Sequence, residues 1–200
     1  MNERIVRDLS RLPMHGMGSA SPTWWGTAAF MLIEGTGFAL AIAVYLYLMS
    51  IAATWPIDAP RPDLAPGSWI TGLLLVSLVP NYLVLRWARE QDLRKVQIGL
   101  VVMSILGIAP LAIRGLEFPA LNVSWDQNAY GSIVWTLLGL HTIHIITDVA
   151  DTLVLGVLMF TRHADNPRRF GDVQDNCMYW AFVVATWLPI YGCIYWIPRL

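Results

Sequence analysis

The chain has 200 residues, of which 56% are hydrophobic and only 14% are charged, and ten of them are tryptophans. Soluble domains have about 45–50% apolar and about 25% charged residues, so this composition excludes an ordinary soluble protein and predicts a membrane protein. The 13 Lys+Arg and 14 Asp+Glu residues nearly balance and lie mostly between apolar runs. Because no basic face is available to neutralise phosphates, we expect no nucleic-acid partner.

The apolar runs predict an all-α, polytopic membrane protein with five transmembrane helices. Residues 1–23 are polar and are predicted to form a cytoplasmic N-terminal segment, while residues 24–200 form one membrane domain. A spanning helix needs roughly 20 apolar residues, and five runs supply that length. The predicted spans are 25–55, 69–87, 96–113, 130–160 and 177–197.

The basic residues predict the orientation of these spans. Ten of the 13 Lys+Arg residues fall in the N-terminal segment and in the second and fourth connections, and Arg114 is counted in the third connection. Since short cytoplasmic segments carry an excess of Lys and Arg, we expect the N-terminus inside and the C-terminus outside.

Glu34 is a carboxyl group near the middle of the first predicted span, roughly 15 Å into the bilayer at 1.5 Å per residue. An ionisable group at this depth is costly and needs either a partner or a task. One interpretation is a carboxylate that handles protons or contacts lipid. The other is a protonated acid that is hydrogen-bonded to a neighbouring helix.

The fourth span carries a polar face made of His141, His144, Asp148, Asp151 and Thr152. The spacing of three and four residues from His141 to Asp151 places the two histidines and two aspartates within about 80° of arc on a helix, and Thr152 joins the same face. Two histidines and two carboxylates could bind a metal, but such centres take ligands from several helices, and no other span contains a histidine. We therefore predict no metal, and expect this face to pack against a partner subunit or a hydrated cavity.

The last span carries an aromatic face at spacings of seven and four residues. Its members are Trp180, Trp187, Tyr191 and Tyr195. This face is either a packing surface or a groove that holds lipid.

These residues together resemble subunit III of the haem–copper cytochrome c oxidases and related quinol oxidases. The run from Tyr130 to Ser132, followed by Gly139 to His144, is similar to the Tyr-Gly-Ser and His-Gly-x-His signature of that family. The aromatic run from Tyr179 to Trp196 resembles the family's final helix. Glu34 falls where the family keeps an intramembrane glutamate, and Glu117 with the following phenylalanine resembles its Glu-Tyr pair.

The resemblance implies a subunit without redox centres in the bacterial inner membrane, in a short five-helix form. Its partners would be the catalytic subunit I, which carries haem and copper, subunit II, and structural phospholipid. The resemblance also implies that the chain stabilises subunit I and supports proton uptake in aerobic electron transport. The candidate residues for proton uptake or a lipid cleft are Glu34, His141, His144 and Glu117.

Several positions depart from the family's pattern. Ala181 and Val184 stand where the family commonly has His and Asp, and Thr142 replaces the glycine of the histidine signature, while Asp148 and Asp151 are additional acids. Three alternatives stay open: a subunit III-like accessory protein of a nitric oxide reductase, a transporter, and an independent intramembrane metalloenzyme that uses the polar face of the fourth span.

Overall fold

The computed structural model describes residues 21–200, so most of the predicted cytoplasmic segment 1–23 lies outside the described residues. All regular secondary structure of the described part is helical, and its five long helices are each long and apolar enough to cross a membrane. They are α1 (Pro22–Ile51), α2 (Leu64–Arg89), α3 (Leu93–Glu117), α4 (Ala129–Met159) and α5 (Arg168–Tyr191). The predicted fold class, an all-α bundle of five spans, is confirmed.

Local capping chemistry determines where three of these helices begin. The side chains of Ser21, Asp92 and Asn128 accept hydrogen bonds from backbone N–H groups in the first turns of α1, α3 and α4. Each satisfies one of the N–H donors that have no partner inside a helix. The helices therefore start at polar residues just outside the apolar runs.

The helix ends differ from the predicted spans where polar residues continue a helix. The fifth helix begins at Arg168 rather than at 177, and α3 continues to Glu117 rather than ending at 113. Hydrophobicity marks only the part of a helix that lies in lipid, whereas backbone hydrogen bonding extends into the polar turns beyond it. The first helix ends at Ile51 rather than at the predicted residue 55, because the backbone becomes extended at Ala52, just before a proline-rich connection.

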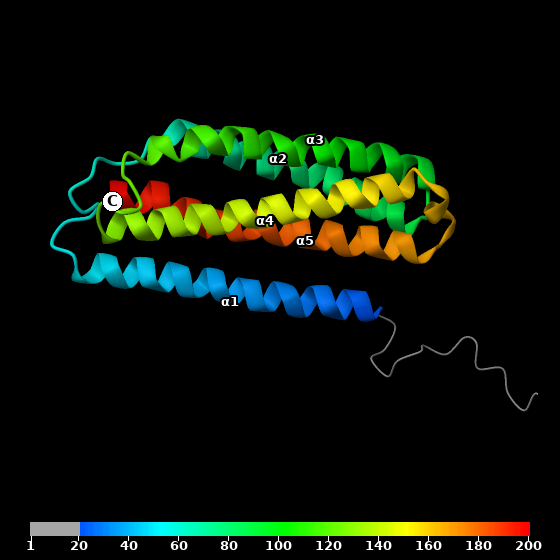
Figure 1. The fold of residues 1–200 in the computed structure, drawn as a ribbon, viewed down its shortest axis with the longest axis horizontal. Helices are drawn as coiled ribbons and strands as arrows, with labels where there is room; N and C mark the ends of the chain where they lie inside the picture. Colours follow the sequence, from blue (N-terminus) through cyan, green and yellow to red (C-terminus); the bar gives the residue numbers. More distant parts are fainter. Residues whose placement is uncertain (1–20) are drawn as a thin grey trace, which may run out of the picture.

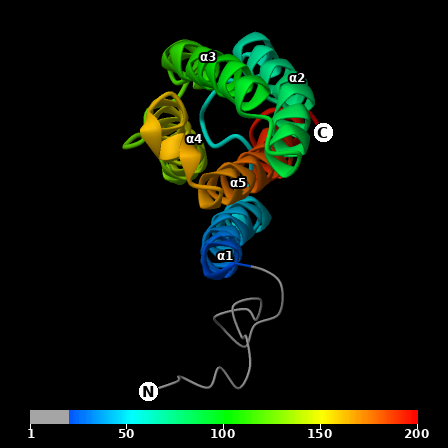
Figure 2. The same ribbon diagram turned by 90° about the vertical axis from the view of Figure 1, so that its right-hand side faces the viewer.

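Four of the helices enclose the core, and the remaining one lies outside. Viewed from the end, α2, α3, α4 and α5 form a ring, while α1 lies against its outer side next to α4 and α5 (Figures 1 and 2). The only buried side chains of α1 are Phe38 and Tyr45. By contrast, α5 packs against α1, α2 and α4 and has the largest buried share of the five.

Short helical turns complete the described chain. They are the turns Pro119–Leu121, Arg162–Asp165 and Ile197–Arg199, and a π-helical turn, Gly192–Trp196, that extends α5.

Arg114 lies inside α3, so counting it as a residue of a connection is wrong. Its side chain is 2% exposed and forms an ion pair with Glu117 one turn later. The apolar run ends before Arg114, but the helix continues because a buried partner balances the charge. Without Arg114, the connections predicted to lie outside contain fewer basic residues, so the excess of Lys and Arg in the segments predicted to be cytoplasmic becomes larger. The orientation itself stays a prediction.

Candidate functional site

Glu34 lies between α1 and the helices that support it. Its Oε1 is 3.1 Å from Nε2 of His144 on α4, and its Oε2 accepts a hydrogen bond of 2.8 Å from the hydroxyl of Tyr179 on α5. The side chains of Glu34 and His144 are 15% and 8% exposed. The ring of Phe38, one turn after Glu34, packs on the imidazole of His144 at 4.7 Å. Both oxygens of this intramembrane carboxyl group therefore have a partner.

The hydrogen bond of His144 to its own helix determines which ring nitrogen faces Glu34. Its Nδ1 is 2.6 Å from the carbonyl oxygen of Leu140, which can only accept, so Nδ1 carries a hydrogen. Nε2 therefore faces Oε1 of Glu34, and a proton placed between these two atoms would join the side chains in a hydrogen bond. The Glu34–His144 contact is thus the place on this face where a carboxyl group and an imidazole can share a proton.

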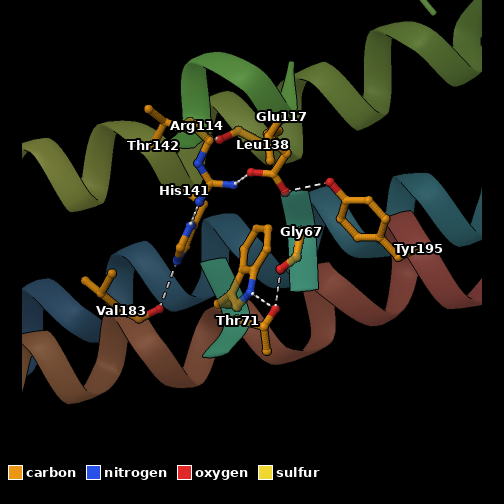
Figure 3. A network of polar contacts seen from close by, with 10 residues as sticks. Gly67, Thr71, Arg114, Glu117, Leu138, His141, Thr142, Val183 and Tyr195 are labelled. Atoms are coloured by element: carbon orange, nitrogen blue, oxygen red, sulfur yellow. Dashed lines mark hydrogen bonds and ion pairs between the residues drawn. The ribbon is translucent and has the colours of Figure 1, made fainter. Parts of the chain in front are cut away.

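His141 has a different environment, although it lies on the same face of α4. Nη2 of Arg114 donates to Nδ1 of His141 at 2.8 Å, and Nε2 of His141 donates to the carbonyl oxygen of Val183 at 3.0 Å (Figure 3). A guanidinium group cannot accept, so Nδ1 must be the unprotonated nitrogen. Protonation of His141 would break its bond to Arg114, and this histidine is therefore held in one neutral tautomer.

The ion pair beside His141 links three helices. Nη1 of Arg114 donates to Oε2 of Glu117, and the hydroxyl of Tyr195 donates to Oε1 of the same carboxylate at 2.6 Å (Figure 3). The guanidinium of Arg114 also lies 4.5 Å from the ring centroid of Trp187. A buried ion pair is tolerated better when further contacts compensate its remaining atoms. Tyr195 and His141 supply hydrogen bonds and Trp187 a cation–π contact, while Nε of Arg114 has no hydrogen-bond partner among the described residues.

The aromatic face of α5 lies along α2, where polar atoms meet it at regular intervals. The indole N–H of Trp180 donates to Ser77 at 2.8 Å, and the indole N–H of Trp187 donates to Thr71 at 2.7 Å. The hydroxyl of Tyr191 is 2.8 Å from that of Ser68. These contacts, with that between Tyr195 and Glu117, give every polar atom of the aromatic face a partner within the bundle.

The acidic end of the polar face contacts a third set of residues. The side-chain amide of Asn176 on α5 donates to Oδ2 of Asp151 at 3.1 Å and to Oδ1 of Asp148 at 3.5 Å. The hydroxyl of Thr152 donates to the amide oxygen of Asn176 at 3.2 Å. Asn176 is therefore the residue through which α5 contacts this end of α4.

The side chains on the polar face of α4 thus contact three different partners and do not point toward one common site. His141 contacts Arg114, His144 contacts Glu34, and the two aspartates contact Asn176. Within residues 21–200, no group of three or more His, Cys, Asp or Glu side chains is placed to hold a metal ion. The metalloenzyme alternative needs such convergence, so the geometry of the described residues gives it no support.

Three residues that complete these sites are not among the site residues predicted from the sequence: Arg114, Tyr179 and Asn176. The spacing of Arg114 and Glu117 places them on one face of a helix, which is a detectable signal for an ion pair. Tyr179 and Asn176 have no such signal, because their partners lie on helices distant in sequence, and only the packing of the bundle brings them together.

Comparisons with known proteins agree with the resemblance. The family model described as cytochrome c oxidase subunit III matches residues 73–198. A cytochrome c oxidase subunit 3 from Artemia franciscana is 25% identical over 199 residues, which cover 95% of this chain and 76% of that protein. Its counterpart from Synechocystis sp. is 25% identical over 179 residues, covering 86% of this chain and 74% of that protein.

A third relative is matched over a shorter part of its length. The cytochrome c oxidase subunit 3 from Pylaiella littoralis is 24% identical over 154 residues, which cover 74% of this chain. The chain spans only 55% of that protein. The family model covers well over half of the chain, including all of α3, α4 and α5. The chain therefore belongs to the cytochrome c oxidase subunit III family.

Proposed function

We propose that this chain is subunit III of a bacterial respiratory haem–copper terminal oxidase of the cytochrome c oxidase type. In this role it lies in the inner membrane, packs against subunits I and II, binds structural phospholipid and supports proton uptake. The haem and copper centres belong to the catalytic partner, and this chain carries no redox centre. The family match over residues 73–198 and the five membrane-spanning helices support this proposal.

The Glu34–His144 pair is the observation that best supports a role in proton uptake. A carboxyl group and an imidazole that share one proton can release or accept it by a small change in hydrogen bonding, without separating charges across the bilayer. The pair lies at the outer edge of the four-helix ring, where α1 meets α4 and α5, and both side chains retain some exposure. His141 lacks this property because Arg114 fixes its tautomer.

Purification of the tagged chain from its native membrane in a mild detergent tests the proposed assembly. We expect haem absorbance and copper to co-purify in fixed proportion with the chain. Co-purification with a partner that reduces nitric oxide and lacks copper would instead identify the accessory protein of a nitric oxide reductase. Stoichiometric iron or zinc in the isolated chain, lost in a His141→Ala/His144→Ala variant, would show a metalloenzyme.

The variant Glu34→Gln tests the role of the shared proton. Glutamine keeps an oxygen for Tyr179 but cannot hold an exchangeable proton between itself and His144. We expect unchanged haem content in the complex, but either a shorter period of sustained oxygen turnover or altered bound phospholipid. Glu90→Gln, at an exposed carboxylate paired with Arg86, serves as the control. If Glu34→Gln matches the wild type in both turnover and lipid content, Glu34 has only a packing role.

A further inference from the structure

A cleft of about 460 Å³ lies between α1, α4 and α5 at the end of the bundle where α1 and α5 begin (Figure 1). Its rim includes Thr23 in the first turn of α1 and Arg169 in the first turn of α5. Along α5 the lining continues from Arg169 to Tyr179, which at 1.5 Å per residue is a depth of roughly 15 Å. The cleft therefore extends from the end of the bundle to about the depth at which Glu34 lies.

The inner end of this cleft meets Glu34 through Tyr179. Tyr179 lines the cleft, and its hydroxyl donates to Oε2 of Glu34 at 2.8 Å. Phe30, another lining residue, stacks on the ring of Tyr179 at 6.0 Å. Thr147 lines the cleft beside Tyr179, and its hydroxyl donates to the carbonyl oxygen of His144 at 3.0 Å. Tyr179 therefore stands between the space of the cleft and the Glu34–His144 contact.

The charges that line this cleft do not balance. Four aspartates and one cation face it, and Arg169 is paired with Asp172 at 2.9 Å. The other three carboxyl groups, those of Asp148, Asp151 and Asp175, have no cation among the lining residues. A cleft lined by one sign of charge raises the local concentration of small ions of the opposite sign. This lining therefore favours the entry of protons.

Buried atoms without a partner point to water in the cleft. Asp148 is 1% exposed and Asp175 is 8% exposed, and in both residues Oδ2 has no hydrogen-bond partner among the described residues. A buried carboxyl oxygen without a partner is unfavourable, and water can supply the missing hydrogen bond whereas acyl chains cannot. Water occupies roughly 30 Å³ per molecule in the liquid, so the cleft has room for several molecules.

We propose that this cleft is a hydrated passage that carries protons to Glu34 from the side of the membrane where α1 and α5 begin, with Tyr179 as the last relay. The distribution of Lys and Arg predicts that this side is cytoplasmic. The inference rests on the proposed role in proton uptake and adds the route. Asp148 and Asp151 are additional to the family's pattern, so the route concerns this chain rather than the family.

Transfer through Tyr179 moves one proton and leaves the relay unchanged. When Glu34 is a carboxylate, the hydroxyl of Tyr179 passes its hydrogen to Oε2 of Glu34. The phenolic oxygen takes a replacement from a hydronium ion in the cleft, which becomes water. Tyr179 stays neutral, and one proton has moved from the aqueous phase to Glu34. The carboxyl groups of Asp148 and Asp151 hold protons on the way to this relay.

Cysteine accessibility tests whether water reaches the inner end of the cleft. Thr147→Cys places a thiol in the lining, and Ile146→Cys places one at the neighbouring position, which is exposed but outside the cleft. Inverted membrane vesicles that contain the whole complex are treated with a cationic, membrane-impermeant methanethiosulfonate. Because the thiolate is the reactive form and needs water to ionise, we expect the thiol at 147 to react roughly tenfold faster. The protein's own Cys177 and Cys193 are buried and should give no signal.

Tyr179→Phe tests the relay. The substitution removes the hydroxyl that contacts Glu34 and keeps the ring that packs on Phe30. We expect the initial rate of proton uptake, measured with a pH-sensitive dye when oxygen is added to the reduced complex, to fall by roughly threefold or more. Haem content and the haem spectrum should not change. Tyr82→Phe removes the hydroxyl of an exposed tyrosine on α2 and should keep the wild-type rate.

A further pair of variants tests the acidic lining. Asp148→Asn/Asp151→Asn removes two carboxyl groups while keeping the size of both side chains, and should also slow proton uptake. Asp92→Asn makes the same change at the start of α3, outside the cleft and at a cap where asparagine is equally suitable, and should not. Helical content and elution volume, measured by circular dichroism and gel filtration, verify that the variants are folded.

Three results would overturn the inference. They are equal reactivity of the thiols at 147 and 146, a wild-type rate of proton uptake in Tyr179→Phe, and a wild-type rate in the double aspartate variant. The subunit III role is tested separately. If haem and copper co-purify with the chain but the thiol at 147 does not react, only the proton route fails. If neither haem nor copper co-purifies, the oxidase role fails whatever the thiol does.

Discussion

At the scale of single residues, neighbouring histidines on one helix face have partners of different chemistry. Arg114 contacts His141 as a donor and permits only an acceptor nitrogen, whereas the Glu34 carboxyl group can both hold and accept a proton beside His144. The two histidines share a helix, a face and similar burial, so the sequence around them gives no means of telling them apart. The difference comes entirely from the groups opposite them on α1 and α3.

Arg114→Leu should destabilise the chain strongly. The substitution leaves the carboxylate of Glu117 buried with only Tyr195 as a donor, and removes the donor to His141. Breaking one side of a buried ion pair costs about 3–5 kcal/mol. We expect a large drop in the melting temperature of the purified protein, followed by intrinsic tryptophan fluorescence.

Two further variants separate the loss of pairing from a general effect of removing arginine. Arg114→Leu/Glu117→Leu removes both charges and should recover much of the lost stability. Arg86→Leu removes an exposed ion pair with Glu90 and should change the melting temperature little. A double variant as unstable as the single one would contradict this account.

At the scale of helices, α2 and α5 are joined by a series of hydrogen bonds between small hydroxyl residues and large aromatic ones. Ser77 pairs with Trp180, and Thr71 pairs with Trp187. Small residues on α2 let the indole rings approach its backbone, which is how helices associate tightly in lipid, where hydrophobic burial gives no driving force. The glycine Gly67 at the start of α2 continues this pattern, because the ring of Tyr195 lies where its side chain would be.

Gly67→Ala should therefore disturb the junction between α2 and α5. A Cβ atom at this position would lie 2.5 Å from the ring of Tyr195, which is fixed by its bond to Glu117. Overpacking of this kind costs about 1–3 kcal/mol. The measurement is thermal unfolding of the purified protein.

Gly72→Ala on the same helix provides the matched comparison. No atom lies within 4 Å of a Cβ built there, so the substitution should be neutral or stabilising, since alanine favours helix over glycine by about 1 kcal/mol. Equal effects of the two substitutions would show that the contact with Tyr195 is not what restricts Gly67.

At the scale of the whole molecule, the predicted orientation can be tested by labelling introduced cysteines, because the protein's own two cysteines should not react. Cys177 and Cys193 are buried and should not react with a membrane-impermeant maleimide. A cysteine at the exposed Glu90, between α2 and α3, should be labelled only from the cytoplasmic side. A cysteine at the exposed Thr54, in the connection after α1, should be labelled only from outside. The reverse pattern in intact cells and inverted vesicles would show that the orientation is wrong.

The sequence was sufficient to predict the number of spans, their class and the family, because hydropathy and spaced motifs are local properties of the chain. It could also locate Glu34 and the polar face of α4, since ionisable residues in apolar runs are conspicuous. It could not show that this face contacts three separate partners, because Arg114, Glu34 and Asn176 reach it from α3, α1 and α5. Pairing between distant helices depends on packing, which periodicity within one helix does not encode.

The position of α1 outside the ring also bears on how the protein is assembled during synthesis (Figure 2). A chain is made from its N-terminus, yet α1 packs on α4 and α5, which are made later. Until they are inserted, Glu34 lies in the bilayer without His144 or Tyr179. An ionisable group in lipid without a partner is costly. The insertion of α4 and α5 therefore relieves a cost that α1 cannot relieve alone, and this gives α1 a reason to stay beside the place where the later helices are inserted.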